Sequence, residues 1–285
     1  MEASLARRLW RLGEPVHAII YFHPASDAWA AAGLRGFWRG YFATRAAPLG
    51  AVGSGPVTAT FYNFHPAMVA KALPEVWTMA SPEQALAARL AGANAALRDA
   101  LGPHADAADI AATAEVLRGA VEGLPMVGRA LFAANVALPW PESPLLALWH
   151  GLTLLREHRG DGHNAALLAT GIDGCAAHVL AAAAGGAPRD VTQPARGWTD
   201  DDWTVATAAL AERGLVDADG RATDAGRELH AGIEHRTDEL AIAPWVHLDD
   251  DALEVVTTTV ARLAGRVAGA GVIRFPNPMG LPAPG

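Results

Sequence analysis

The chain has 285 residues, of which 51% are hydrophobic and 18% are charged, and its formal net charge is -8. This composition excludes a disordered chain and a uniformly basic surface for nucleic acid, although a local basic patch remains compatible with it. The single cysteine, Cys175, excludes an internal disulfide and a cysteine-based zinc site.

The N-terminal segment predicts a helix and no targeting signal. Leu5, Leu9 and Leu12 recur at helical spacing within residues 3–21. Residues 1–20 lack the continuous apolar stretch and small-residue cleavage site of a signal peptide. No run reaches the roughly 18 apolar residues that a membrane span needs. We therefore expect a cytoplasmic protein without a membrane partner.

Most of the first half predicts helices. Residues 27–46 form one aromatic-rich helical segment, which a Gly/Pro-rich break ends. Residues 57–64, VTATFYNF, have the β-branched and aromatic composition of a strand or a buried extended segment. Further on, Ser81 fits the N-cap of a helix and Pro82 fits its first position.

The segment GFWRGYFATR places aromatic side chains and arginines on neighbouring helix faces. Such a stripe is typical of a core, with the arginines paired at its edge. The alternative is an aromatic-walled pocket in which Arg39 or Arg45 receives a carboxylate or a phosphate. The candidate ligand-binding residues of this half are Phe37, Trp38, Arg39, Tyr41, Arg45, Tyr62 and His65.

The Pro-rich segment LPWPESP, residues 138–144, predicts a domain boundary. We expect an N-terminal helical domain over residues 1–137, which is the candidate ligand-binding part. Residues 138–272 are expected to form the second domain. Residues 273–285 are rich in Pro and Gly and cannot form a long helix, so we expect an extended or mobile tail.

The second half begins with one helix, which is followed by two short helices in a helix-turn-helix pattern. Residues 144–158, PLLALWHGLTLLREH, predict a helix with one leucine face. A polar turn, Arg-Gly-Asp-Gly, follows, where Asp161 can cap a second helix, HNAALLAT. After Gly171, Asp173 can cap a third, GCAAHVLAAAA. Short helices joined by a tight glycine-containing turn are typical of helix-turn-helix units.

The same stretch gathers polar groups, for which three interpretations stay open. The first is a structural junction, in which Asp161 is a helix cap. The second is a site for an organic ligand or anion, with His150, His158 and Arg159 as candidate binding residues. The third is a catalytic His–Asp pair or a divalent metal held by two histidines and a carboxylate, although no fixed metal motif is present. The candidate metal ligands are His158, Asp161 and His163; the cofactor is unknown.

A wing is predicted farther along the chain. Thr199 and Asp202 fit a capping box, and the helix they open ends near Gly214. An Asp-Gly turn at Asp219 then predicts a small β-hairpin, after which Thr223 can cap a long helix. This order of helices and hairpin predicts a winged helix-turn-helix.

Residues 210–240, LAERGLVDADGRATDAGRELHAGIEHRTDEL, resemble the wing region of MarR-type regulators in their Leu-x-x-Arg-Gly-Leu, Asp-Gly and Thr-Asp-x-Gly elements. The whole chain resembles the actinobacterial SalK-like helix-turn-helix family. That resemblance rests on GLRGFWRGYFATRAAPLG, TATFYNFHPAMV, ALPWP, LWHGLTLLREHRGDGH and RGWTDDDW, which cover most of residues 5–245. It implies a winged-helix fold and, by analogy, regulation.

The expected recognition helix has few side chains that can contact DNA. Residues 173–180 contain no Arg or Lys, whereas contacts with base edges and phosphates need donor or cationic side chains. In the wing, Arg221 stands among acidic residues. The candidate DNA-binding residues are His178 and Arg221, so binding to duplex DNA is doubtful.

We therefore predict a mostly α protein, in which an N-terminal helical part packs on a C-terminal winged helix-turn-helix with a small β-hairpin wing. The leading functional interpretation is a small-molecule-responsive regulator of the winged-helix type. One alternative is an enzyme that uses the His, Asp and Arg residues between 150 and 163, with or without a divalent metal. Another is a scaffold that only binds protein. The sequence leaves the ligand, the reaction and the oligomeric state open.

Overall fold

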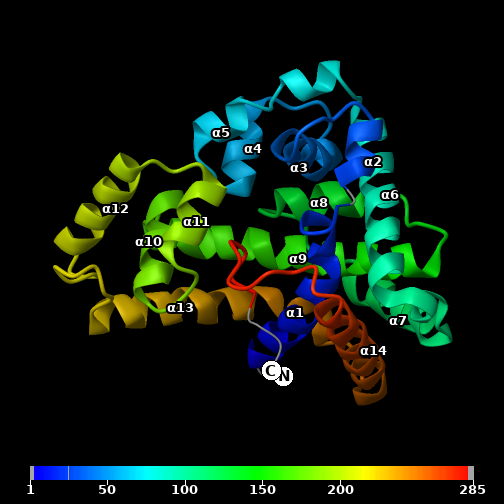
Figure 1. Ribbon diagram of the computed structural model, residues 1–285. Coiled ribbons are helices and arrows are strands. Elements are labelled where there is room, and N and C mark those ends of the chain that lie inside the picture. The colour runs from blue at the N-terminus through cyan, green and yellow to red at the C-terminus, as the bar shows by residue number, and fades with distance from the viewer. Residues whose placement is uncertain (1–2, 25, 282–285) are drawn as a thin grey trace.

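The computed structural model describes residues 3–24 and 26–281, which are mostly helical (Figure 1). The expected mostly-α class is therefore confirmed. Across these described residues no sheet forms, and the expected hairpin wing is reduced to one antiparallel bridge between Val216 and Ala222. The reason is local, because the Asp217 carboxylate accepts the backbone N–H groups of Asp219 and Arg221, and such bonds compete with a strand ladder.

In the described part of the first half there are eight helices with short 3₁₀ turns between them. The helices are α1 (Ala3–Ala18), α2 (Ser26–Ala31), α3 (Phe37–Ala46), α4 (Ser54–Phe61), α5 (Pro66–Ala70), α6 (Pro82–Leu101), α7 (Ala108–Val121) and α8 (Ala130–Val136), and the 3₁₀ turns are Ile19–Tyr21, Ala47–Leu49, Glu75–Thr78 and Gly102–Asp106.

The second half is built on one long helix that crosses the molecule (Figure 1). Its helices are α9 (Pro144–Ala169), α10 (Gly174–Ala183), α11 (Arg189–Arg196), α12 (Asp200–Glu212), α13 (Asp224–Ala241) and α14 (Asp250–Gly269), with a 3₁₀ turn at Ala243–Trp245.

Two expectations for the first half are wrong. Residues 57–61 belong to helix α4 and are not a strand. Pro56 lies in the first turn of α4, where its missing N–H costs no hydrogen bond, and the Thr60 hydroxyl donates to the Pro56 carbonyl. The segment 27–46 is two helices, because Gly33 and Gly36 take positive φ angles of 89° and 90° between them.

The predicted Arg-Gly-Asp-Gly turn is also wrong, since α9 continues through it without a break. Its glycines allow close packing. A Cβ on Gly162 would lie 3.1 Å from the Cβ of Leu240 on α13, and a Cβ on Gly151 would lie 2.9 Å from the Cβ of Leu117 on α7. The helix thus carries glycine where a neighbouring helix approaches it.

The predicted helix starts that rest on capping chemistry are confirmed elsewhere. Ser81 forms a capping box with Gln84, and Thr199 forms one with Asp202. The side chains of Asp173 and Thr223 cap α10 and α13.

The buried apolar residues form two main cores that share α9. The first core draws on residues 6–152 and 241–281, and in it α14 packs against α1 and α7. The second core covers residues 166–233 and belongs to the helix-turn-helix unit. The C-terminal half of α9 therefore connects the two cores.

The C-terminal segment was expected to be extended or mobile; through Leu281 it has no helix, but it is packed and not mobile. The side chains of Ile273, Asn277 and Leu281 are all at least 95% buried. The Asn277 carboxamide oxygen accepts the N–H groups of Met279 and Leu281, which fixes the turn. Residues 282–285 of the predicted tail lie outside the described residues.

No single helix in the described part of the chain is both long and apolar enough to cross a membrane. The pair α9 and α10, bent by 92°, meets the length and composition test only when the two are taken together.

Candidate functional site

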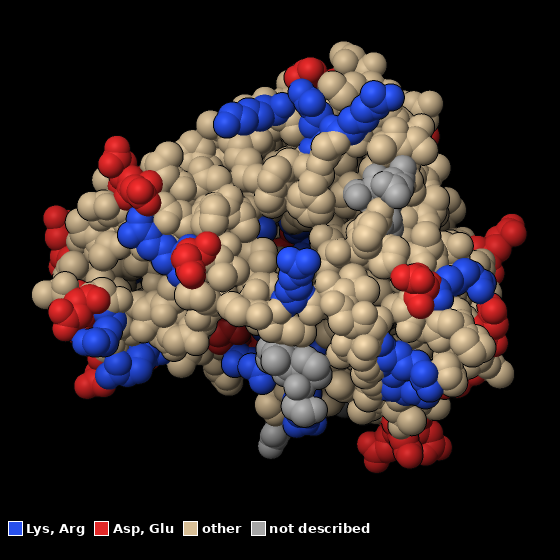
Figure 2. Space-filling model, viewed as in Figure 1, with Lys and Arg blue, Asp and Glu red and all other residues tan. Residues whose placement is uncertain are grey.

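A polar cavity of about 260 Å³ lies where elements of both cores meet. Helices α1, α3, α4, α8, α9, α11 and α13 and the C-terminal segment supply its wall. The face drawn in Figure 2 is hollowed near its centre, with charged atoms visible below the surface. The volume is close to the lower end of small-molecule sites, which span roughly 300–1,000 Å³.

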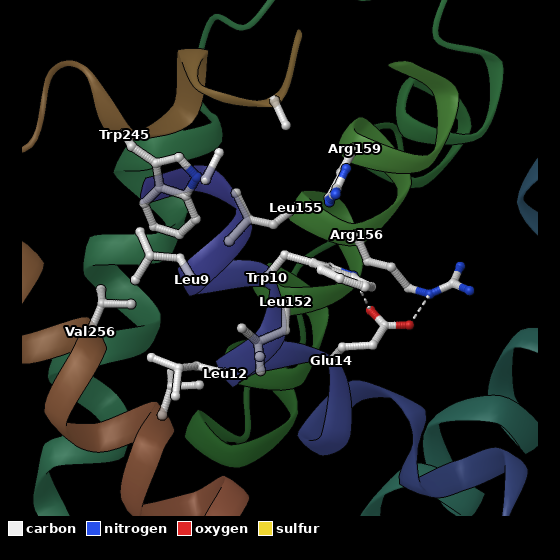
Figure 3. A pocket seen from close by; sticks show the side chains of 14 residues that line it. Leu9, Trp10, Leu12, Glu14, Leu152, Leu155, Arg156, Arg159, Trp245 and Val256 are labelled. Carbon is white, nitrogen blue, oxygen red and sulfur yellow. Dashed lines mark hydrogen bonds and ion pairs between the residues drawn. The ribbon is translucent and has the colours of Figure 1, made fainter. Parts of the chain in front are cut away.

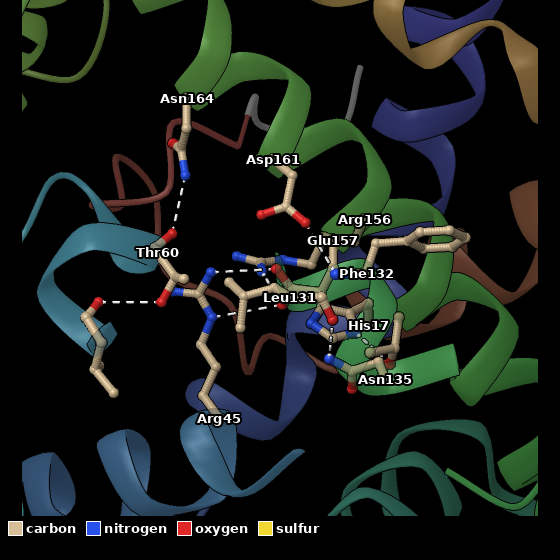
Figure 4. Close-up of polar contacts among 12 residues, drawn as sticks. His17, Arg45, Thr60, Leu131, Phe132, Asn135, Arg156, Glu157, Asp161 and Asn164 are labelled. Carbon is tan, nitrogen blue, oxygen red and sulfur yellow. Dashed lines mark hydrogen bonds and ion pairs between the residues drawn. The ribbon is translucent and has the colours of Figure 1, made fainter. Parts of the chain in front are cut away.

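A buried ion-pair network forms one side of the cavity (Figure 4). Glu157, which is 1% exposed, lies 3.4 Å from Nη2 of Arg45 and 2.7 Å from Nη1 of Arg156. Arg156 also donates through Nε to Glu14 at 3.0 Å. Burial acts to raise the pKa of Glu157, but Arg45 and Arg156 outweigh it and hold the pKa at about 2. The carboxylate is therefore ionised at neutral pH.

Arg159, one turn farther along α9, connects the cavity to α13. Its Nη2 lies 3.4 Å from Glu234 and 3.2 Å from Asp238. Arg7 of α1 pairs with the same two carboxylates. These two arginines and two acids balance in charge, as do Arg45 and Arg156 with Glu14 and Glu157.

Arg196, the last residue of α11, is the exception. Its side chain lines the cavity, yet among the described residues no carboxylate lies within ion-pair distance of its guanidinium. Nη2 donates to the Pro278 carbonyl at 2.7 Å, the guanidinium also bonds Tyr41, and Nε has no partner among the described residues. The guanidinium lies 4.5 Å from the ring centre of Phe64. Burial, with the nearby cations Arg45 and Arg156, lowers the pKa of Arg196 to about 10. At neutral pH it remains a buried cation.

A second, smaller pocket of about 30 Å³ lies beside the cavity and is mainly apolar (Figure 3). Trp10, Glu14, Arg156 and Arg159 line both spaces. The Trp10 indole N–H donates to Glu14 at 3.1 Å, and Arg159 lies over the Trp10 ring. This shared wall separates the apolar pocket from the polar cavity.

Of the ligand-binding candidates in the first half, only Tyr41 and Arg45 line the cavity. Phe37 and Trp38 pack in the aromatic cluster that contains Tyr41. The other three candidates make separate contacts: Arg39 lies 3.9 Å from Glu75, Tyr62 donates to the Ile172 carbonyl, and His65 accepts a bond from Ala67 as the N-cap of α5.

The candidates around residues 150–163 do not converge. His150 packs edge-on against Trp140, and His158 packs edge-on against Phe132. Burial, reinforced by neighbouring arginines, lowers the pKa of His150 to about 4 and that of His158 to about 3, so both rings are neutral. His163 lines the cavity and bonds Thr237 of α13, whereas Asp161 binds a backbone N–H of α8.

The predicted metal ligands are therefore separated. All three residues lie on one continuous helix but make different contacts. His158 packs against the Phe132 ring, Asp161 accepts from the Phe132 N–H, and His163 bonds Thr237. Over the described ranges, no group of three His, Cys, Asp or Glu side chains is placed to hold a metal ion.

Sequence reasoning did not single out four of the charged residues that define the cavity: Glu14, Arg156, Glu157 and Arg196. Of these, Arg156 falls within residues 150–163, whose His, Asp and Arg side chains the enzyme interpretation takes together. For three of the four the sequence carries a signal, which is a charged residue placed among the apolar residues of a helix. Arg156 and Glu157 follow directly on the leucine face of α9, and Glu14 lies among apolar residues of α1. Charged residues on an apolar helix face need partners when they are buried.

The structure also corrects the expected recognition helix. No residue of α10 is exposed. A Cβ on Gly174 would lie 2.3 Å from the Tyr62 carbonyl, and His178 lies 3.3 Å from the Asn63 carbonyl. Because the loop after α4 packs on α10 at Gly174 and His178, and the remaining α10 residues are buried or only partly exposed, this helix presents little surface to a DNA groove.

Helices α11 and α12 form a helix-turn-helix arrangement whose second helix is exposed, unlike α10. Only three residues, 197–199, join them, and Gly197 adopts the left-handed conformation, with φ 76°. A short glycine-containing turn between two helices is typical of a helix-turn-helix. The second helix, α12, has an exposed face and directly precedes the bridge Val216–Ala222.

The charges on this unit are mixed (Figure 2). Three aspartates, Asp200 to Asp202, form the first turn of α12. Three of the arginines nearby pair with acids: Arg189 with Asp200, Arg221 with Asp219 and Arg227 with Asp224. The exposed Arg213 at the end of α12 instead donates to the backbone carbonyls of Thr170 and Gly171. Arg221 is nevertheless solvent-exposed, as a DNA contact would need to be.

Comparison with known proteins agrees with this architecture. A family model described as a helix-turn-helix family matches residues 6–274. No curated protein and no solved structure matches the chain. Helix-turn-helix elements typically place their second helix in the major groove of DNA. The chain belongs to this helix-turn-helix family, which indicates a DNA-binding regulator at the coarse level.

Proposed function

We propose that the protein is a small-molecule-responsive regulator of the winged-helix type, in which the polar cavity binds the effector. The observation that carries the proposal is the position of Arg196. This residue is part of the cavity wall and is also the last residue of α11, directly before the turn into α12. A ligand that contacts Arg196 therefore acts on the helix-turn-helix unit without an intermediate element.

A second connection runs through the loop after α4. Asn63 lines the cavity, and its backbone carbonyl accepts the indole N–H of Trp198 at 3.1 Å. The backbone N–H of His65 donates to the Arg196 carbonyl at 2.9 Å. The turn between α11 and α12 is thus bonded to a cavity-lining loop, and a ligand that shifts this loop changes the support of α12.

The finer family assignment belongs to the same proposal. The order α12, Asp-Gly turn and α13 supports a MarR-like wing region, and the SalK-like resemblance spans both cores. We assign the recognition position to α12, because it precedes the wing and has an exposed face. The acidic first turn of α12 makes its DNA contacts weak unless the unit rearranges.

Substitutions at Gly160 test directly whether the cavity binds the effector. Gly160 lines the cavity from the middle of α9, and a Cβ there would meet only a Glu157 oxygen at 3.8 Å. Gly160→Phe should fill the cavity, whereas Gly160→Ala should leave it open. A metabolite library is screened by thermal shift on wild type and both variants, and hydrogen exchange is then measured over residues 197–212.

We expect compounds that raise the melting temperature of wild type and Gly160→Ala but not of Gly160→Phe. The same compounds should change amide exchange in α12. The proposal fails if bound compounds leave exchange in residues 197–212 unaltered, or if they stabilise Gly160→Phe equally well.

A further inference from the structure

One of the four arginines that line the cavity has no carboxylate partner among the described residues. Three of its four arginines, Arg45, Arg156 and Arg159, have carboxylate partners within 3.5 Å. The fourth, Arg196, has none among the described residues. It is only 8% exposed, so water screens its charge poorly.

A buried cation without a counter-ion is costly to a folded protein, because its desolvation is not compensated. The hydrogen bonds of Arg196 are also incomplete. Nη2 gives one N–H to the Pro278 carbonyl and the guanidinium also bonds Tyr41, but among the described residues Nε donates to nothing. An arginine with open donors on a cavity wall is suited to a planar anion, which takes two N–H groups at once.

We infer that the cavity takes a small organic monocarboxylate, with its single negative charge paired to Arg196. This inference rests on the proposed function and specifies the effector class. One carboxylate neutralises the one unpaired cation, whereas a phosphate monoester would bring ≈ -1.5 to -2 charges at pH 7. The neighbouring wall suits an apolar or aromatic body, since Phe61, Phe64 and Leu131 line the cavity near its arginines.

The test uses the full chain and three matched probes: phenylacetate, its neutral amide phenylacetamide, and benzylphosphonate. Affinities are measured by calorimetry for wild type, Arg196→Met, Arg196→Lys and Arg98→Gln. Arg98 is a control, because it is an exposed residue of α6 paired with Asp106, away from the cavity. Loss of a charged hydrogen-bond partner should weaken phenylacetate binding roughly 10- to 100-fold in Arg196→Met.

We expect phenylacetate to bind wild type and Arg98→Gln better than the amide or the phosphonate does. Arg196→Lys should bind with intermediate affinity, because it keeps the charge and loses the planar donor pair. Without ligand, Arg196→Met should melt at the same temperature as wild type or higher, since it removes an unpaired buried charge. A purely structural arginine would instead lower it.

Several results would overturn the inference: no saturable phenylacetate binding to wild type at millimolar concentration, equal binding of the amide, tighter binding of the phosphonate, or full affinity in Arg196→Met. The proposed function fails separately. If phenylacetate binds through Arg196 but leaves hydrogen exchange in α12 unaltered, the carboxylate site stands and the regulatory role falls. If only neutral compounds bind and they change hydrogen exchange in α12, the regulatory role stands and the carboxylate site falls.

Discussion

The carboxylate of Asp161 accepts a hydrogen bond from the backbone N–H of Phe132, with 2.9 Å between Oδ2 and N. Phe132 is the third residue of α8, whose N-cap residue, Arg129, makes no capping bond of its own. Asp161 therefore caps a helix, as its surroundings in the sequence suggested, but the helix is α8 and not the continuation of its own chain. Burial raises the pKa of Asp161 to about 6.

Replacement of Asp161 should separate its hydrogen bond from its charge. Asp161→Asn keeps an acceptor for the Phe132 N–H, whereas Asp161→Ala leaves it unpaired and should cost about 0.5–2 kcal/mol. Because its folded pKa is raised, Asp161 binds its proton more tightly in the folded state between about pH 4 and pH 6, and its own contribution to stability falls as the pH rises through this window.

The Asn variant lacks this loss. Its stability should equal or exceed that of wild type above about pH 6, and the difference should vanish towards pH 4. Urea unfolding of the three proteins at several pH values measures this. An Asn variant as unstable as the Ala variant at neutral pH would show that the charge itself is needed.

The glycines of α9 should respond in opposite ways to the same change. Gly160→Ala adds a methyl group that meets only a Glu157 oxygen at 3.8 Å, so it should stabilise the helix by up to about 1 kcal/mol. Gly151→Ala places the methyl group 2.9 Å from the Cβ of Leu117 and should destabilise. Thermal denaturation of both variants checks the pair, and a gain in both would refute close packing between α7 and α9.

These glycines explain why the sequence misleads at this point. Arg-Gly-Asp-Gly has the composition of a turn, and local chemistry offers no reason to continue a helix through it. The reason is tertiary, because α7 and α13 approach α9 at Gly151 and Gly162. Capping at Ser81, Asp173, Thr199 and Thr223 was predictable, since each capping side chain accepts from a backbone N–H only three residues away.

In the candidate site, too, contacts between residues close in the chain were predictable and contacts between distant residues were not. Arg45 and Tyr41 were predictable as a pair because one helical turn separates them. The partner of Arg45, Glu157, lies 112 residues away in the chain. No periodicity connects such residues, and one sequence without relatives gives no covariation. The unpaired state of Arg196 is a property of the assembled cavity and cannot be predicted from local sequence.

Glu157→Gln should be strongly destabilising. The amide cannot balance Arg45 and Arg156, which are both largely buried, and removal of one partner from a buried ion pair costs about 3–5 kcal/mol. The matched control is Glu115→Gln, in an exposed pair with Arg118, which should change stability by less than about 1 kcal/mol. Urea denaturation compares the two, and similar small effects would mean that the network contributes little.

Binding to random duplex DNA should be weak and should depend only slightly on salt. The slope of affinity against salt reports the number of phosphates that cations neutralise. On this unit Arg189, Arg221 and Arg227 are each paired with an aspartate. Fluorescence anisotropy over a series of KCl concentrations measures the slope. Asp201→Asn should strengthen binding by reducing repulsion, and a steep slope in wild type would show that other cations reach the DNA.

Deletion of the chain after Gly271 should lower the melting temperature. The deletion removes Ile273 and Leu281, which are 5% and 4% exposed, together with the Pro278 carbonyl that accepts from Arg196. Full burial of each such aliphatic side chain contributes about 1.5–3 kcal/mol, and loss of the carbonyl leaves the Arg196 guanidinium with fewer partners. As a control in the full chain, Phe275→Ala should have a small effect because Phe275 is 36% exposed. Circular dichroism melting decides the matter: a truncated chain that melts with wild type would mean that the segment covers the core without stabilising it.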